Sequence, residues 1–242
     1  MHSLLKAFSK KFVLLVSITQ NDPNLARIAL ENGADAVKVH LNCAHFASGT
    51  DFGSWEAEKE KIAKVAEVVR PHIPLGIVTS AEVVPLGIVT GAEVVPNAQD
   101  LSEIRQFGFD FWDLFANHIP PEYLKWKELA HMSAVGPDWT PEFVQDLVSL
   151  GVDVIESSII PRDLYRTRLT AADLCQYKRL VRSAGVPVIV PTQKKIRPDE
   201  VKYLQEVGVS GLAIGAVVTG LGTAYLGERV AAFRKAIDEI YR

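Results

Sequence analysis

The sequence has few cysteines, no apolar run of membrane-spanning length and no block of basic residues. Its two cysteines, Cys43 and Cys175, lie far apart and fit neither a metal-binding nor a redox spacing. The apolar core of Lys10–Ile18 is too short to span a membrane, and the polar segment Gln20–Asp22 follows it. With 26 basic and 29 acidic residues and a net charge of −3, nucleic acid is disfavoured as a partner. These features predict a reduced, cytoplasmic protein without a membrane span.

The length of the chain suits one α/β barrel, a fold in which about 200–250 residues form a single domain. It has 242 residues, of which 48% are hydrophobic, and apolar runs alternate with stretches of helical periodicity. The predicted strands are Phe12–Thr19, Ala36–Leu41, Leu75–Val78, Phe111–Phe115, Met132–Val135, Val154–Ser158, Val188–Val190 and Gly211–Ile214. The predicted helices are Asn24–Asn32, Trp55–Val69, Asp100–Gln106, Pro121–Leu129, Pro141–Leu150, Ala171–Ala184, Pro198–Val207 and Leu226–Tyr241. Eight such units predict a single-domain (β/α)8 TIM barrel over residues 1–242, with Leu4–Ser9 as a short helix at its bottom.

Glycines mark several junctions between a helix and the next strand. Gly33-Ala-Asp35, Gly108-Phe-Asp110, Gly151-Val-Asp153 and Gly208-Val-Ser210 all fall at such junctions. Glycine ends a helix readily because it adopts the left-handed conformation. Since these junctions precede every second predicted strand, the pattern resembles a barrel assembled from two-unit pieces.

An 11-residue tandem duplication surrounds the third predicted strand. Residues 74–84 and 85–95 are identical at ten of eleven positions, and no other part of the chain repeats in this way. Only one copy can supply the strand. We expect the first copy to do so because it follows the preceding helix directly, although both copies carry the same strand pattern.

Polar side chains occupy barrel-facing positions in three predicted strands. Alternation turns Lys38, His40 and Asn42 inward, and it places Asp113 and Glu156 on the inner faces of later strands. Buried charges are costly unless they are paired or functional. Lys38, His40, Asp113 and Glu156 therefore form a candidate catalytic group for proton transfer or carbonyl chemistry. The alternative is a structural ion pair inside the barrel.

The segment from Cys43 to Gly53 is too long for a simple connector and contains His45. We interpret it as a substrate lid, with a non-functional loop as the alternative. His40 and His45 match no familiar ligand spacing, so the sequence predicts no metal and no other cofactor.

A glycine turn after the last predicted strand is typical of an anion site. Gly215, Ala216, Thr219 and Gly220 follow that strand, and backbone amides exposed there would bind phosphate. Lys194 or, alternatively, Lys195 is a candidate for an added positive charge. Thr192, at the end of the preceding strand, is a candidate for substrate binding, as is Asn42. The alternatives are an ordinary strand-to-helix turn and a solvated surface lysine.

Several short motifs resemble those of the ribulose-phosphate-binding barrel superfamily, and within it N-acetylmannosamine-6-phosphate 2-epimerase. The motifs are Val16-Ser-Ile-Thr-Gln20, Asn32-Gly-Ala-Asp-Ala-Val-Lys-Val39, Ile73-Pro-Leu-Gly-Ile-Val78, Ile214-Gly-Ala-Val-Val-Thr219 and Val230-Ala-Ala-Phe-Arg-Lys-Ala-Ile237. The resemblance implies a phosphate site at the last turn and substrate roles for Gln20 and Lys38. The epimerase family's catalytic lysine falls near Thr79 or Ser80 here, and its glutamate falls near Thr192, so epimerase catalysis is not carried over.

The sequence thus favours an enzyme that acts on a small phosphorylated sugar or related metabolite as an isomerase, epimerase or carbon–carbon lyase. In this hypothesis Glu156 or Asp113 is the general base, and Lys38 polarises a carbonyl or forms a Schiff base. The alternative is a non-catalytic barrel that binds a phosphorylated ligand as a sensor or scaffold. A phosphate-assisted transferase is a third option, but no acidic pair for Mg²⁺ is evident. Barrels of this type are often dimers, so a homodimer is expected.

Overall fold

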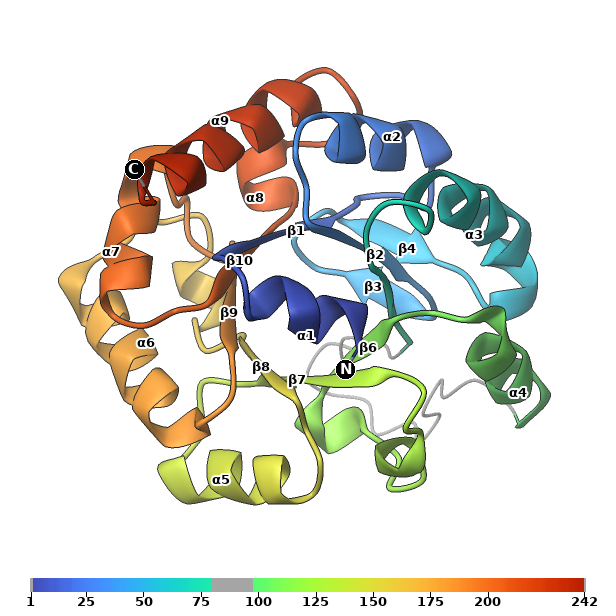
Figure 1. Cartoon of the computed structure of the whole chain (residues 1–242), viewed down its shortest axis with the longest axis horizontal. Coiled ribbons are helices and arrows are strands. Elements are labelled where there is room, and N and C mark those ends of the chain that lie inside the picture. The colour runs from blue at the N-terminus through green and yellow to red at the C-terminus, as the bar shows by residue number, and fades with distance from the viewer. Residues whose placement is uncertain (1, 80–97, 242) are drawn as a thin grey trace.

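Eight parallel strands close into a barrel in the computed structural model, which describes residues 2–79 and 98–241 (Figure 1). The strand order around the barrel is β1-β10-β9-β8-β7-β6-β5-β2. These strands are β1 (Val13–Ser17), β2 (Ala36–His40), β5 (Leu75–Val78), β6 (Phe111–Phe115), β7 (Ala130–Val135), β8 (Val154–Ser157), β9 (Val188–Pro191) and β10 (Gly211–Ile214). The closed parallel barrel confirms the predicted fold class.

Helices surround the barrel, and most lie where the periodicity of the sequence predicts them. The α-helices are α1 (Ser3–Phe8), α2 (Pro23–Glu31), α3 (Trp55–Val69), α4 (Ala98–Phe107), α5 (Pro141–Ser149), α6 (Ala171–Ala184), α7 (Val201–Glu206), α8 (Ala216–Thr219) and α9 (Leu226–Glu239). The 3-10 turns are η1 (Ala116–His118), η2 (Tyr123–Lys125), η3 (Arg162–Leu164) and η4 (Pro198–Glu200). No helix among the described residues has both the length and the apolar character needed to cross a membrane.

The helix predicted over Pro121–Leu129 is wrong, because this segment contains only the single turn η2. Tyr123 and Trp126 are three residues apart and stack with ring centroids 4.2 Å apart. Tyr123 also meets the ring of Trp112 on β6 edge-on at 6.1 Å. Residues i and i+3 share one face of a 3-10 turn, so packing of these rings takes the place of a continuous helix.

The first copy of the duplicated segment forms β5, as expected. Its strand residues pair with β2 on one side and with β6 on the other. Residues 80–97, which contain the rest of the first copy and all of the second, lie outside the described residues.

Three of the four glycine junctions have the form Gly-X-Asp, and each connects neighbouring strands at the bottom of the barrel. Their glycines have positive φ angles of 95°, 87° and 106° at Gly33, Gly108 and Gly151, respectively. The aspartates then accept hydrogen bonds from backbone amides of the preceding strand or its edge, in the pairs Asp35–Leu14, Asp110–Leu75 and Asp153–His131. Each junction therefore joins two successive barrel strands, β1 with β2, β5 with β6 and β7 with β8.

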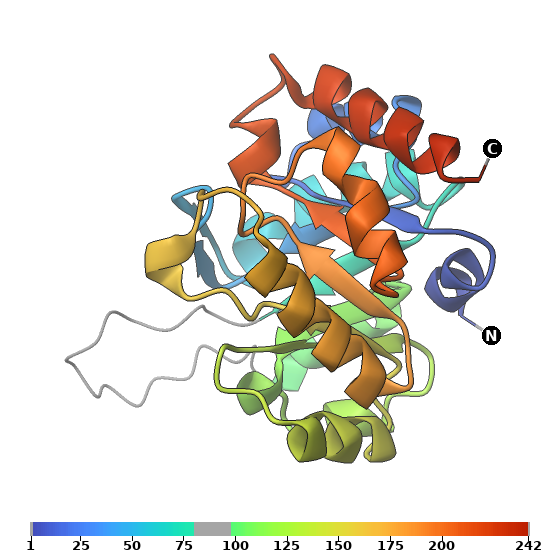
Figure 2. The same ribbon diagram turned by 90° about the vertical axis from the view of Figure 1, so that its left-hand side faces the viewer.

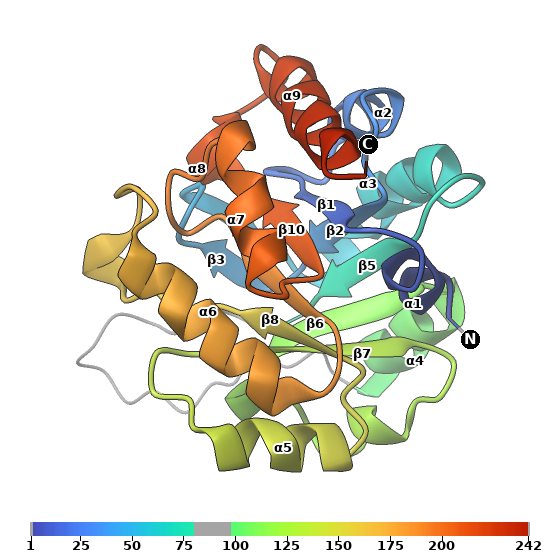
Figure 3. The same cartoon turned by 60° about the vertical axis from the view of Figure 1, so that its left-hand side comes forward.

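The interior of the barrel is apolar at one end and polar at the other. Helix α1 lies across the apolar end, where Leu4 is fully buried against inward-facing residues such as Phe111 and Met132 (Figure 1). Figure 3 shows α1 and β3 at opposite ends of the barrel. The end that α1 leaves open is the carboxyl end of the strands, the usual place of a binding site in this fold.

Candidate functional site

A cavity of about 110 Å³ opens at the carboxyl end of the barrel. Its polar lining comes from residues spread around the ring of strands and from the hairpin after β2. These lining residues are Ser17, Lys38, His40, Cys43, His45, Asp113, Glu156, Ser158, Tyr165, Thr192 and Gln193. The cavity also touches Gly215 and Ala216, so strands and the last turn converge on one space.

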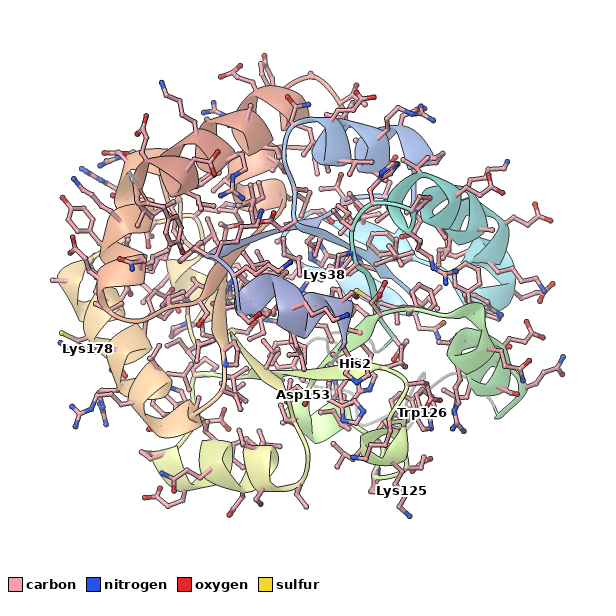
Figure 4. The ribbon with its side chains drawn as sticks, in the orientation of Figure 1. His2, Lys38, Lys125, Trp126, Asp153 and Lys178 are labelled. Carbon is pink, nitrogen blue, oxygen red and sulfur yellow. The ribbon has the colours of Figure 1, made fainter. Side chains whose placement is uncertain are left out.

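Lys38 lies at the centre of the candidate site, inside the ring of strands (Figure 4). Its Nζ donates to Asp113 Oδ2 at 2.5 Å and to Glu156 Oε2 at 2.6 Å. The hydroxyl of Ser158 donates to the other carboxylate oxygen of Glu156 at 2.9 Å. Because β2, β6 and β8 each turn one charged residue inward, the barrel brings together residues far apart in the sequence.

The burial of this cluster shifts its protonation equilibria. Burial alone would lower the pKa of Lys38, but the charges of Asp113 and Glu156 outweigh it, and the pKa is raised. Burial and then the charge of Glu156 raise the pKa of Asp113 to about 8, against the opposing effect of Lys38. Burial would also raise the pKa of Glu156, yet the charge of Lys38 and hydrogen bonds from Asp113, Lys38 and Ser158 lower it. The lysine is therefore held in its charged form, and of the two carboxyl groups Asp113 is the one that retains a proton to higher pH.

His40 lies beside this cluster and is neutral. Its Nε2 is 3.2 Å from the hydroxyl of Ser17, and its ring stacks on Phe52 with centroids 4.8 Å apart. Burial, followed by the charges of His45 and Lys38, lowers the pKa of His40 well below its usual value. Its Nδ1 is buried and has no hydrogen-bond partner among the residues that the structure describes.

The segment interpreted as a lid is a two-stranded hairpin, β3 (Cys43–His45) and β4 (Thr50–Phe52). It extends toward the loop after β8, and Figure 2 shows both on the side of the barrel away from α1. Arg166 Nη2 in that loop donates to the carbonyl of Ala47 at 2.6 Å, and the rings of Phe46 and Tyr165 meet edge-on at 5.3 Å. The hairpin thus covers part of the cavity and brings His45 to its wall.

Some backbone amides of the glycine turn already donate hydrogen bonds within the protein. The amide of Gly215 donates to the hydroxyl of Thr192 at 3.0 Å. The amides of Val218 and Thr219 donate to the carbonyl of Gly215. This leaves the amides of Ala216 and Val217 at the start of α8 as the donors without an acceptor among the described residues.

Only part of the predicted phosphate-binding set reaches the cavity. Gly215 and Ala216 line it, whereas Thr219 and Gly220 do not. Lys194 is buried elsewhere, where its Nζ donates to the Thr167 hydroxyl at 2.9 Å and lies 3.4 Å from an Asp173 oxygen.

The three predicted substrate-binding residues lie in different environments. Thr192 lines the cavity. Gln20 is exposed in a separate surface groove beside Asn21 and Lys61. Asn42 has a left-handed φ of 49° and turns the chain into the hairpin, with its amide bonded to the carbonyl of Gly53. The structure therefore does not bring Gln20 or Asn42 to the cavity.

Among the polar residues that line the cavity, the sequence analysis assigned no role to Ser17, Ser158, Tyr165 or Gln193. Alternation along β1 gives a signal for Ser17, because Val13, Leu15 and Ser17 share the inner face. Tyr165 and Gln193 lie in loops, where no periodicity identifies the side that faces the cavity. Gln193 holds its loop in place by accepting from the amide of Ile160 and donating to the Tyr165 hydroxyl.

The candidate site shows no arrangement typical of a metal centre. Within residues 2–79 and 98–241, no three His, Cys, Asp or Glu side chains are grouped to hold a metal ion. The cavity lining includes the acid–base groups of Lys38, Asp113 and Glu156.

Comparisons with known proteins give similarity in structure but not in sequence. No protein-family model and no curated protein matches the sequence significantly. The fold is similar to thiamine phosphate pyrophosphorylase from Pyrococcus furiosus, with a TM-score of 0.65, 17% identity and coverage of 97% of this chain and 99% of that one. It is also similar to N-acetylmannosamine-6-phosphate 2-epimerase from Clostridium perfringens, with a TM-score of 0.59, 16% identity and coverage of 90% and 91%. A third similar structure is phosphoribosyl anthranilate isomerase from Thermus thermophilus, with a TM-score of 0.58, 15% identity and coverage of 95% and 100%. At these identities the likeness shows the fold, a single-domain (β/α)8 barrel.

Proposed function

We propose that this protein is an acid–base enzyme that moves a proton at the carbon next to a carbonyl in a small phosphorylated sugar or related metabolite. The observation that carries the proposal is the buried cluster in which Lys38 is hydrogen bonded to both Asp113 and Glu156. Two carboxyl groups whose pKa values are shifted in opposite directions provide an acid and a base at one pH. An isomerase or epimerase needs such a pair, and a carbon–carbon lyase can use it.

The roles follow from the charges of the three side chains. Ionised Glu156 takes the proton from carbon, and protonated Asp113 supplies a proton to oxygen or to the neighbouring carbon. Lys38 stays charged and stabilises the negative charge that develops on the carbonyl oxygen. Because its amine is hydrogen bonded to both Asp113 and Glu156 and its pKa is raised, Lys38 does not supply the neutral amine that a Schiff base requires.

The glycine turn supports a phosphorylated substrate. The amides of Ala216 and Val217 lie at the start of α8, and Ala216 lines the cavity. A phosphate bound there would fix the position of the reacting carbon without taking part in the reaction. The names of the three similar structures all contain a phosphate-bearing compound, which is consistent with this class of ligand.

Exchange of carbon-bound hydrogen in D₂O tests the proposal directly. A panel of aldose and ketose phosphates is incubated with the protein, and ¹H NMR follows the loss of the signal of the hydrogen next to the carbonyl. We expect exchange with the wild-type protein and a loss of at least about 100-fold in Glu156→Gln and in Asp113→Asn. Glu60→Gln, at an exposed position on α3, is the matched control. Wild-type protein without exchange on any member of the panel would contradict the proposal.

Borohydride reduction distinguishes a charge-stabilising role of Lys38 from a role in forming a Schiff base. Treatment of the protein with borohydride and a carbonyl substrate from the panel should leave Lys38 unmodified in peptide mass spectrometry. A reduced adduct on Lys38 would replace the charge-stabilising role with a covalent one.

A non-catalytic barrel that binds a phosphorylated ligand is the second candidate. Two observations support it. The Gly215 amide already donates to the Thr192 hydroxyl, and the Lys38 amine already contacts both Asp113 and Glu156, as it would in a purely structural cluster. Saturable binding of a sugar phosphate in calorimetry, without hydrogen exchange or product, would favour this candidate.

A further inference from the structure

The hairpin β3–β4 holds the imidazole of His45 in one orientation at the cavity wall. Its Nδ1 is 2.7 Å from the hydroxyl oxygen of Ser48, three residues along the chain. The same oxygen is 3.3 Å from the amide of Thr50, which donates to it. His45 lines the cavity together with Lys38 and Glu156, so Nε2 is the ring nitrogen left for a ligand.

The hydrogen bonds around Ser48 assign the tautomer of this imidazole. A serine hydroxyl has one proton to donate. The carbonyl oxygen of His45 is 3.5 Å from the Ser48 oxygen, whereas Nδ1 is only 2.7 Å away. The carbonyl oxygen of His45 already accepts hydrogen bonds from the backbone amides of Ser48 and Gly49, so we assign the proton of the Ser48 hydroxyl to Nδ1. With Nδ1 as acceptor, the neutral ring carries its own proton on Nε2.

The charged surroundings keep the ring neutral. Burial lowers the pKa of His45 to about 4, the positive charge of Lys38 acts in the same direction, and Glu156 only partly opposes them. His40, whose ring centroid is 4.9 Å away, is also neutral. A neutral imidazole donates its N–H in a hydrogen bond and keeps that proton, so it does not act as a general acid.

We propose that His45 is a further catalytic residue, whose Nε2–H donates a hydrogen bond to the substrate's carbonyl oxygen as that oxygen becomes negative. This role rests on the proposed function. When Glu156 takes the proton from carbon, the electrons of the C–H bond form a carbon–carbon double bond, and the carbonyl π electrons move to oxygen. Lys38 supplies charge to that oxygen, and His45 supplies a directed donor from the hairpin. When a proton returns to carbon, the electrons move back and the hydrogen bond weakens.

Nitrogen NMR of protein labelled with ¹⁵N-histidine tests the tautomer without any substrate. We expect one ring with the Nε2–H tautomer from pH 5.5 to 8, assigned to His45 by its absence in His45→Gln. In Ser48→Ala the loss of the hydroxyl should mix the two tautomers. An Nδ1–H tautomer for His45, or a ring that titrates near pH 6.5, would overturn the inference.

Hydrogen exchange kinetics on the substrate found in the panel test the catalytic role. We expect kcat to fall about 100- to 1000-fold in His45→Ala, with KM changed less than about 3-fold, because the bond strengthens only as charge develops. His45→Gln, whose amide can donate, should recover part of kcat. His72→Gln, at an exposed position, is the control. A kcat of His45→Ala within about 3-fold of wild type would refute the role. If the wild-type protein shows no exchange at all, the proposed function and this role fail together, and the measured tautomer still stands by itself.

Discussion

The hydroxyl of Thr192 accepts a hydrogen bond from the amide of Gly215 at 3.0 Å and so joins the ends of β9 and β10. Thr192→Val keeps the shape of the side chain but removes the acceptor. We expect the free energy of unfolding to fall by about 1 kcal/mol, the usual net value of such a bond. Urea denaturation measures the change, and calorimetry with inorganic phosphate shows whether the freed amide alters binding. Thr192→Ser keeps the hydroxyl and should keep the wild-type phosphate affinity. Equal stability of Thr192→Val and wild type would show that the amide of Gly215 has another acceptor.

Removal of the positive charge of Lys38 should destabilise the barrel strongly. Lys38→Met leaves Asp113 and Glu156 buried without a positive charge, and both residues are at most 6% exposed. Breaking a buried ion pair in this way costs about 3–5 kcal/mol. Denaturant unfolding measures the loss. Lys38→Met combined with Asp113→Asn and Glu156→Gln should recover a large part of it, since no unpaired charge remains. A loss below about 1 kcal/mol in the single variant would mean that water reaches the cluster.

Asp113 should make the protein less stable as the pH rises from 6.5 to 8. Its pKa in the folded state is about 8, well above the usual value of an aspartate, so the folded protein holds a proton that the unfolded chain has released. The free energy of unfolding should therefore fall by about 1.4 kcal/mol per pH unit near pH 6.5, by about half of that near pH 8, and level off above pH 8. The histidines of the site do not interfere there. The pKa values of His40 and His45 are lowered, so their contribution to stability is lost only as the pH falls below about 6.5.

Unfolding curves at four pH values between 6.5 and 8 check this prediction. Asp113→Asn cannot release a proton and should show a flat profile in the same window. Parallel profiles for the variant and the wild type would contradict a raised pKa at Asp113.

The alternation of inward-facing and outward-facing side chains along each strand made the cluster of Lys38, Asp113 and Glu156 predictable. Lys38 interrupts an apolar run at a position whose neighbours, Val37 and Val39, pack toward the helices. Asp113 and Glu156 occupy the equivalent inner positions of their strands, so a parallel barrel of eight strands brings the three together. The Gly-X-Asp junctions were recognisable for the same reason, because a glycine that ends a helix and a strand-starting aspartate are local features.

Loops and capping bonds were not predictable in this way. Lys194 follows a strand directly, but the chain turns it toward Asp173 and Thr167 and away from the cavity. Gln20 is placed by the turn before α2, which exposes it, and the adjacent Asn21 is the buried residue. The bond between Thr192 and Gly215 joins residues 23 positions apart, and no sequence period indicates it. Side-chain direction outside regular elements depends on packing between distant segments.

The contact between the hairpin and the loop after β8 should control the mobility of the hairpin. Arg166→Ala removes the bond to the carbonyl of Ala47, so we expect faster hydrogen–deuterium exchange in residues 43–52. The free energy of unfolding should change by no more than about 0.5 kcal/mol, as for other surface substitutions. Arg168→Ala, an exposed arginine of the same loop, should leave exchange unchanged. Equal exchange in both variants would show that ring contacts alone hold the hairpin.

The duplicated segment provides its own control for the identity of β5. Gly76 lies beside Phe111, and a Cβ at Gly76 would come within 2.1 Å of the Phe111 ring. That ring is fully buried inside the barrel, so Gly76→Ala should lower the free energy of unfolding by about 3 kcal/mol through overpacking. Gly87 has the same place in the second copy, and Gly87→Ala should have little effect because Gly76 occupies the position in β5. Denaturant unfolding of the two variants measures the difference. The reverse order of stabilities would mean that the second copy forms the barrel strand, and equal losses would mean that the two copies exchange places.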